Sequence, residues 1–145
     1  MLFRSKELGD APIPSGASSA AYGLLRLAAL TGEHRYEAAA EGHLRLLHEV
    51  APQEANAFAH LLRALDFHLS PTHEIALCGA DVEALARVVR ERLRPHAVLA
   101  GGDPDGVPLL EGREPVDGRA TAYVCERFAC QRPVTEPDAL RALLD

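Results

Sequence analysis

The sequence predicts a mixed fold, in which packed helices are followed by a small three-stranded α/β unit. Apolar residues recur at helical spacing through the first half, until Ser70-Pro71 ends the pattern. Beyond residue 71, short apolar runs of strand length alternate with a helical stretch, an order typical of a βαβ unit. We therefore expect residues 6–70 and residues 71–145 to form two segments of different structural class.

Composition and charge narrow the class of protein. The 145 residues are 48% hydrophobic and 25% charged, as in folded globular domains with an ordinary core. The formal net charge is -6, whereas a general nucleic-acid binder needs clustered Lys and Arg. No apolar run approaches the about 20 residues that span a bilayer. Three cysteines, an odd number, suit a reducing compartment. We therefore expect a cytoplasmic protein without nucleic-acid or membrane partners.

Two helices are expected to form an antiparallel hairpin, because only a short connection at Thr31-Gly32 separates them. Ser15 is placed to cap the first helix. The expected apolar stripes are Leu24, Leu27, Ala28 and Leu30 on the first helix, and Tyr36, Ala40, His43, Leu47 and Val50 on the second.

A third helix is expected from about Glu54 to Leu69. Its apolar surface is wide, and consists of Ala57, Phe58, Leu61, Leu62, Ala64, Leu65, Phe67 and Leu69. Such a surface predicts cover on more than one side. Three helices cannot supply that cover, so either the chain oligomerises or further helices of the same domain provide it, and we favour the second.

The α/β unit is expected to begin with two parallel strands, residues 73–79 and 96–101, joined by a helix. Asp81 is placed to cap that helix, whose stripe runs to Leu93. A loop follows from residue 102 to residue 118, in which residues 103–106 form a turn. A third strand at residues 120–125 and a last helix from about residue 137 complete the unit.

Several short motifs together resemble one family. They are Pro14-Ser15-Gly16 at a helix start, Leu30-Thr31-Gly32 at its end, and residues 121–125 followed by Cys130 and Pro133. This pattern resembles the C-terminus of the thioredoxin-domain-containing proteins of the spermatogenesis-associated type. A departure is Ala17, which stands where that family has Asn.

The resemblance covers residues 6–145, and we expect residues 1–5 to be non-native. It implies that the helices close an (α/α)6 toroid similar to those of sugar epimerases and glycosidases, and that a small α/β tail follows. It also implies that the partners are the remainder of the same chain, namely the rest of the toroid and an N-terminal thioredoxin-like domain.

Cys125 and Cys130 are the candidate thiol pair. They do not predict a zinc ribbon, which needs four ligands in close pairs, so no metal site is nominated. Residues five apart on an unbroken strand face opposite sides, so a bridge would require a bend between Glu126 and Ala129. The preferred interpretation is two small hydrophobic side chains packed against the sheet. The alternative is a redox pair that exchanges with the thioredoxin-like domain.

Asn56, His60 and Arg63 form a polar strip on the otherwise apolar third helix. In a toroid, such a strip would line a cleft for a polar ligand such as a sugar. The preferred interpretation is the one solvated face that amphipathic helices keep.

No nucleophile elbow, Walker loop or zinc-protease motif is present, so no catalytic residue and no cofactor are nominated. The sequence therefore favours a non-catalytic closing segment of a larger protein. The alternatives are part of a sugar-binding or sugar-modifying cleft, a thiol-redox partner, and a stand-alone helical-repeat adaptor.

Overall fold

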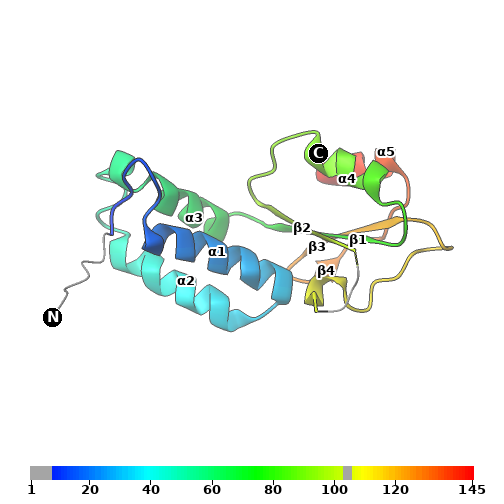
Figure 1. Ribbon diagram of the computed structural model, residues 1–145, viewed down its shortest axis with the longest axis horizontal. Coiled ribbons are helices and arrows are strands. Elements are labelled where there is room, and N and C mark those ends of the chain that lie inside the picture. The colour runs from blue at the N-terminus through cyan, green and yellow to red at the C-terminus, as the bar shows by residue number, and fades with distance from the viewer. Residues whose placement is uncertain (1–7, 103–105) are drawn as a thin grey trace. The chain divides into compact units, whose positions relative to one another are not determined.

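The computed structural model describes residues 8–102 and 106–145. Residues 1–5 and most of the turn expected at residues 103–106 lie outside the described residues. Contacts divide the chain into a helical unit that ends at Ser70 and an α/β unit that begins at Pro71 and includes residues 29–32. Figure 1 shows the helices of the first unit and the sheet of the second.

The helical unit is built from α1 (Gly16–Thr31), α2 (His34–Leu47) and α3 (Ala59–Leu69), with the short 3-10 helix η1 (Ala55–Ala57) before α3. Ser15 caps α1 as predicted, because its Oγ accepts a hydrogen bond from the backbone N of Ser18 at 3.1 Å. The third helix was predicted as one piece from Glu54. It is instead interrupted at Phe58, whose φ of -137° lies outside the helical region.

Small residues dominate the buried faces of the helical unit. Ala21, Ala40 and Ala64 are completely buried, one on each helix. An alanine at a helix contact lets the backbone of the neighbouring helix approach closely. Around them lie the larger buried residues Leu25, Leu44, Leu47, Ala51, Phe58, Leu61 and Phe67.

The predicted apolar stripe of α1 does not coincide with the buried face of that helix. The buried residues of α1 are Ser18, Ala21 and Leu25, whereas Leu27 is 37% exposed. The stripe begins with a serine whose hydroxyl is used locally, and a pattern based on hydrophobicity alone misses such a position. Two further predictions of burial failed at helix ends, where Val50 and Leu69 are 49% and 73% exposed.

The sheet of the α/β unit has four strands in the order β2-β1-β3-β4. The strands are β1 (His73–Cys78), β2 (Ala97–Gly101), β3 (Thr121–Glu126) and β4 (Ala129–Cys130). β1 and β2 are parallel, as the βαβ pattern predicted, while β3 pairs antiparallel with β1 and with β4. The prediction of three strands was therefore wrong, because the two-residue strand β4 was missed.

The two faces of the sheet are covered differently. Helices α4 (Glu83–Arg90) and α5 (Pro137–Leu144) pack on one face. The core there consists of Ile75, Leu77, Leu85, Ala86, Val88, Val89, Ala122, Val124, Leu140 and Leu144. The other face carries the alternate residues of β1 and β3 and is covered by the short 3-10 helix η2 (Pro108–Leu110), whose Leu109 and Leu110 are 0% and 1% exposed.

The start and end of α4 differ from the prediction. Asp81 does not cap the helix, since Val82 occupies the N-cap position and no side chain caps it. Asp81 has a φ of 62°, in the left-handed region, where it forms part of the turn out of β1. Leu93 was expected on the buried stripe, but the helix ends at Arg90 and Leu93 is 91% exposed.

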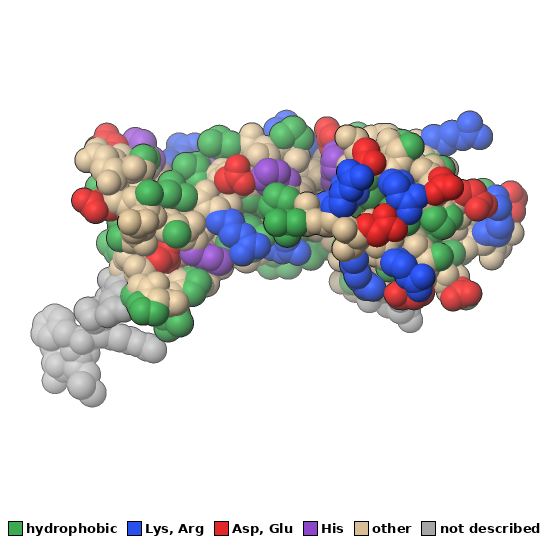
Figure 2. All heavy atoms as spheres, turned by 90° about the horizontal axis from the view of Figure 1, so that it is seen from above, with side chains coloured by type: hydrophobic (Ala, Val, Ile, Leu, Met, Phe, Trp, Pro, Cys, Tyr) green, Lys and Arg blue, Asp and Glu red, His purple; other side chains and the backbone are tan. Residues whose placement is uncertain are grey.

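Positive and negative side chains alternate over the outer surface of α4 and α5 (Figure 2). Arg141 pairs with Glu91 at 2.9 Å, and Arg90 with Glu83 at 3.6 Å. Exposed pairs of this kind contribute only about 0–1 kcal/mol each, so they add little to the stability of the unit. No helix in the described part of the chain has the length and hydropathy needed to traverse a bilayer.

Candidate functional site

A two-residue turn in the α/β unit brings Cys125 and Cys130 together. β3 ends at Glu126, and β4 begins at Ala129, so only Arg127 and Phe128 form the turn. Both turn residues have a positive φ, 49° and 62°, as in the mirror-image turns that suit two-residue hairpins. Cys125 consequently lies directly opposite Cys130 in the ladder.

The two cysteines form a disulfide, with Cα atoms 3.9 Å apart. The interpretation as two separate packed thiols was therefore wrong, and the chain bends between Glu126 and Ala129, where a bridge requires it. The two sulfurs differ in access, because Cys125 is completely buried and Cys130 is exposed. The third cysteine, Cys78, is a free buried thiol whose pKa is raised by burial.

The side chain of Arg113 lies against this disulfide. Its Nη2 is 3.1 Å from Sγ of Cys130 and 3.6 Å from Sγ of Cys125. Its Nη1 donates to the carbonyl oxygen of Leu109, and its guanidinium carbon lies 5.8 Å from the centroid of the Phe128 ring. The neutral disulfide is only a weak acceptor, but a thiolate at either sulfur would face a positive charge directly.

A buried carboxylate completes the surroundings of the disulfide. Glu74 is 4% exposed and lies opposite Cys125 in the ladder between β1 and β3. Its Oε2 accepts a hydrogen bond from the backbone N of Phe128 at 2.7 Å, which holds the turn against the sheet. Burial raises the pKa of the Glu74 carboxyl, although this hydrogen bond and the charge of Arg113 act in the opposite direction.

An open hollow of about 570 Å³ lies beside the exposed sulfur. It is lined by Pro108, Glu111, Gly112, Arg113, Tyr123, Phe128 and Cys130. The hydroxyl of Tyr123 donates to the carbonyl oxygen of Glu114 at 2.7 Å, which ties the loop to β3 at its edge. One sulfur, a guanidinium and an aromatic ring line the same open hollow.

The polar strip expected on the third helix is only partly brought together. His60 and Arg63 both contact Tyr22 of α1: the rings of His60 and Tyr22 have centroids 5.6 Å apart, and Arg63 Nη2 donates to the Tyr22 hydroxyl at 2.9 Å. Asn56 is exposed on η1, and among the described residues it shares no hydrogen bond or ring contact with this group.

Sequence reasoning missed Arg113, Glu74 and Tyr22. Arg113 lies in a loop without periodicity, so its approach to the cysteines depends on the tertiary fold. Glu74 had a signal that was not used, namely a charged residue inside an otherwise apolar strand. Such a residue has to find a partner when the strand is buried.

Comparison with known proteins gives one set of relatives. The chain is 34% identical over 153 aligned residues to human spermatogenesis-associated protein 20, an alignment that covers 98% of this chain and 20% of that protein. The rat protein of the same name is 34% identical and the mouse protein 32%, each with 98% of this chain and 19% of the relative covered. No family model and no solved structure matches the chain.

The chain is thus homologous to a region of a larger protein, and it spans about a fifth of the length of the curated relatives it matches.

Proposed function

From this homology we propose that the chain is a non-catalytic closing segment of a thioredoxin-domain-containing protein, in which the helical unit completes an (α/α) toroid. The observation that carries the proposal is the alignment of 98% of the chain with a fifth of a longer relative. The helices of the toroid that lie outside this segment, and a thioredoxin-like domain, are its partners in the proposal.

Exposed leucines on the surface of the helical unit support the proposal that a further helix packs there. Leu46 is 66% exposed on α2, and Leu69 is 73% exposed at the end of α3. Burial of one leucine contributes about 1.5–3 kcal/mol, so a neighbouring helix that covered both would add a substantial part of a domain's stability. Fold alone does not establish an activity on sugars, so the proposal assigns none.

The test is the behaviour of the 145-residue chain on its own. We expect the chain to self-associate and to bind the dye ANS, because apolar helix faces are uncovered. The double variant Leu46→Gln/Leu69→Gln should reduce both signals. The control is Glu49→Gln, which changes an exposed polar side chain of the same helical unit, and it should change neither signal. A monomeric chain that melts cooperatively and binds no dye would contradict the proposal.

A second candidate function is thiol–disulfide exchange at Cys125 and Cys130, favoured by the contact of Arg113 with both sulfurs. A thiolate of a dithiol protein attacks the exposed Sγ of Cys130 and forms a mixed disulfide. The Cys125–Cys130 bond breaks, and its electron pair leaves on Sγ of Cys125 as a thiolate next to Arg113. The second thiol of the partner, as thiolate, then releases Cys130. The partner becomes a disulfide and this chain a dithiol.

Alkylation of the reduced chain tests the second function. The guanidinium of Arg113 should lower the pKa of the Cys130 thiol, so Arg113→Gln should slow alkylation of Cys130 several-fold near neutral pH. Arg119→Gln is the matched control, because Arg119 is exposed and pairs with Glu136 at 2.8 Å. Equal alkylation rates in the wild type and Arg113→Gln would exclude activation by Arg113.

A further inference from the structure

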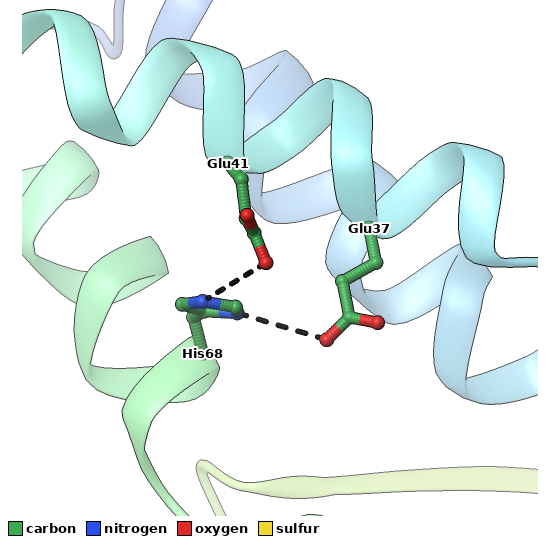
Figure 3. A group of neighbouring side chains, drawn as sticks. All are labelled: Glu37, Glu41 and His68. Atoms are coloured by element: carbon green, nitrogen blue, oxygen red, sulfur yellow. Dashed lines mark ion pairs between the residues drawn. The ribbon is translucent and has the colours of Figure 1, made fainter.

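Three potential metal ligands meet on the helical unit. Glu37 and Glu41 extend from α2 toward His68 of α3 (Figure 3). Nδ1 of His68 lies 4.0 Å from Oε1 of Glu37, and Nε2 lies 3.7 Å from Oε1 of Glu41. One ligand atom from each of the three residues falls within 4.8 Å of the other two.

The helical framework explains why these side chains meet. Glu37 and Glu41 are four residues apart, so they share one face of α2. His68 lies in the last turn of α3, one residue after the buried Phe67. The packed faces of α2 and α3 therefore fix the backbones, and the three polar side chains lie half-buried at the rim of that contact.

The electrostatics favour a cation between these groups. Two carboxylates this close repel each other unless a positive charge lies between them. A carboxylate–imidazole set suits zinc, whereas magnesium and calcium prefer sites built from oxygen alone. Ligands of a tetrahedral zinc ion are about 3.3 Å apart. The ligand atoms, one from each residue, lie within 4.8 Å of one another and must therefore close by up to about 1.5 Å, which rotation about the side-chain bonds of the glutamates can supply.

Neighbouring groups orient both carboxylates through their second oxygens. Arg45 Nη2 lies 2.8 Å from Oε2 of Glu41, and His34 Nδ1 lies 3.3 Å from Oε2 of Glu37. Partners of this kind fix a carboxylate for metal binding and leave its other oxygen directed at the ion. His34 is 96% exposed, so its contact with Glu37 holds that carboxylate more weakly than Arg45 holds Glu41.

We propose that Glu37, Glu41 and His68 bind one Zn²⁺ ion, which links α2 to α3. With three protein ligands, the site keeps a coordination position for water. Because the ion binds the folded helices in preference to the unfolded chain, zinc should also stabilise the helical unit.

Zinc titration of the oxidised, EDTA-treated chain tests the proposal, with affinity measured by competition against a chromophoric chelator. The oxidised state is used because the thiols of Cys125 and Cys130 would otherwise bind zinc. We expect one ion per chain. Glu37→Gln, Glu41→Gln and His68→Gln should each weaken binding by more than about tenfold. Zinc should raise the melting temperature of the wild type but not of these variants.

The matched control is His48→Gln, which removes an exposed histidine that lies 3.8 Å from Glu49. It should leave zinc affinity unchanged. If His68→Gln loses its helical circular dichroism, the nearly isosteric variants Glu37→Gln and Glu41→Gln test whether these residues bind zinc. The proposal is overturned if the chain binds no zinc, or if Glu37→Gln and Glu41→Gln both bind zinc as tightly as the wild type.

Discussion

The carboxylate of Asp10 accepts a hydrogen bond from the backbone N of His60 at 2.8 Å, across fifty residues of chain. The same oxygen lies 3.3 Å from the backbone N of Leu61, and the other oxygen accepts from the backbone N of Ser15 at 2.8 Å. Asp10 therefore serves two helix starts at once. At α3 it takes the place of Phe58, which occupies the N-cap position and has no side chain to cap the helix.

Replacement of Asp10 by alanine should destabilise the helical unit. The first-turn amides of α3 would lose their acceptor, and loss of an N-cap costs about 0.5–2 kcal/mol. Chemical unfolding followed by helical circular dichroism would measure the change. Glu49→Ala, which removes an exposed carboxylate on the same unit, should change stability by less than about 0.5 kcal/mol. Equal effects of the two substitutions would contradict a capping role.

The same contacts predict an acid dependence. Burial raises the pKa of Asp10, but hydrogen bonds from Ser15, Ser18, His60 and Leu61 outweigh it, so the pKa is lowered overall. Because the pKa is lowered in the folded state, the ionised Asp10 contributes to the free energy of unfolding. This contribution is complete above the unfolded pKa of about 3.9 and is lost as the pH falls through the folded pKa. The stability difference between wild type and Asp10→Asn should therefore shrink below about pH 4. A difference that stays constant down to pH 2 would exclude this linkage.

The parts of the fold that sequence reasoning predicted are those set by local pattern. The βαβ order and the cap at Ser15 depend on spacing within a few residues, and both are present. The failures have a common cause. β4 was missed because its turn is Arg127-Phe128, which carries no glycine or asparagine, and the fold imposes a conformation that these residues disfavour.

In the candidate site, too, the sequence predicts what depends on local spacing and misses what depends on the tertiary fold. Cys125 and Cys130 were identifiable from their spacing, and the need for a bend between them followed from strand geometry. Glu74 and Arg113 come from another strand and from a loop. Their contacts with the turn and the disulfide join residues far apart along the chain, and a single sequence does not predict such contacts. Tertiary proximity of this kind follows only from the assembled sheet.

Glu74 should show the opposite pH dependence to Asp10. Burial raises its pKa, so the charged form is disfavoured in the folded state, and this unfavourable contribution appears as the pH rises through the folded pKa. Glu74→Gln keeps an oxygen that can accept from the backbone N of Phe128. The variant should therefore be at least as stable as the wild type at pH 7, and the gap should close in acid.

Glu74→Ala is the informative partner variant. It removes the acceptor of a part-buried backbone N–H, and loss of such a hydrogen bond costs about 0.5–1.5 kcal/mol. Thermal melts of both variants at pH 7 and pH 4 would measure the effects. If Glu74→Gln is as destabilised as Glu74→Ala at pH 7, the charge itself is needed, and the predicted sign is wrong.

The turn between β3 and β4 should accept a stabilising substitution. Arg127 is exposed and has a φ of 49°, a conformation that asparagine adopts more readily than arginine. Arg127→Asn should stabilise the chain by about 0.5 kcal/mol, measured by chemical unfolding with the disulfide intact. Arg127→Ala, which keeps a Cβ without the local hydrogen bonding of asparagine, should give no gain. If both variants are more stable than the wild type, removal of the arginine charge, and not relief of strain in the backbone of residue 127, explains the increase in stability.

Two glycines should respond to alanine with opposite sign. Gly42 lies within α2, where an added Cβ would meet nothing within 4 Å, so Gly42→Ala should stabilise by about 0.5–1 kcal/mol. Gly79 has a φ of 100°, and a Cβ there would lie 3.1 Å from Cγ of Pro115 and 3.4 Å from the backbone Cα of Ala120. An L-residue disfavours this backbone conformation whatever space is available, so Gly79→Ala should destabilise by more than about 1 kcal/mol. Unfolding of the two variants under one set of conditions measures the pair. A stabilised Gly79→Ala would show that the turn after β1 takes another backbone conformation in solution.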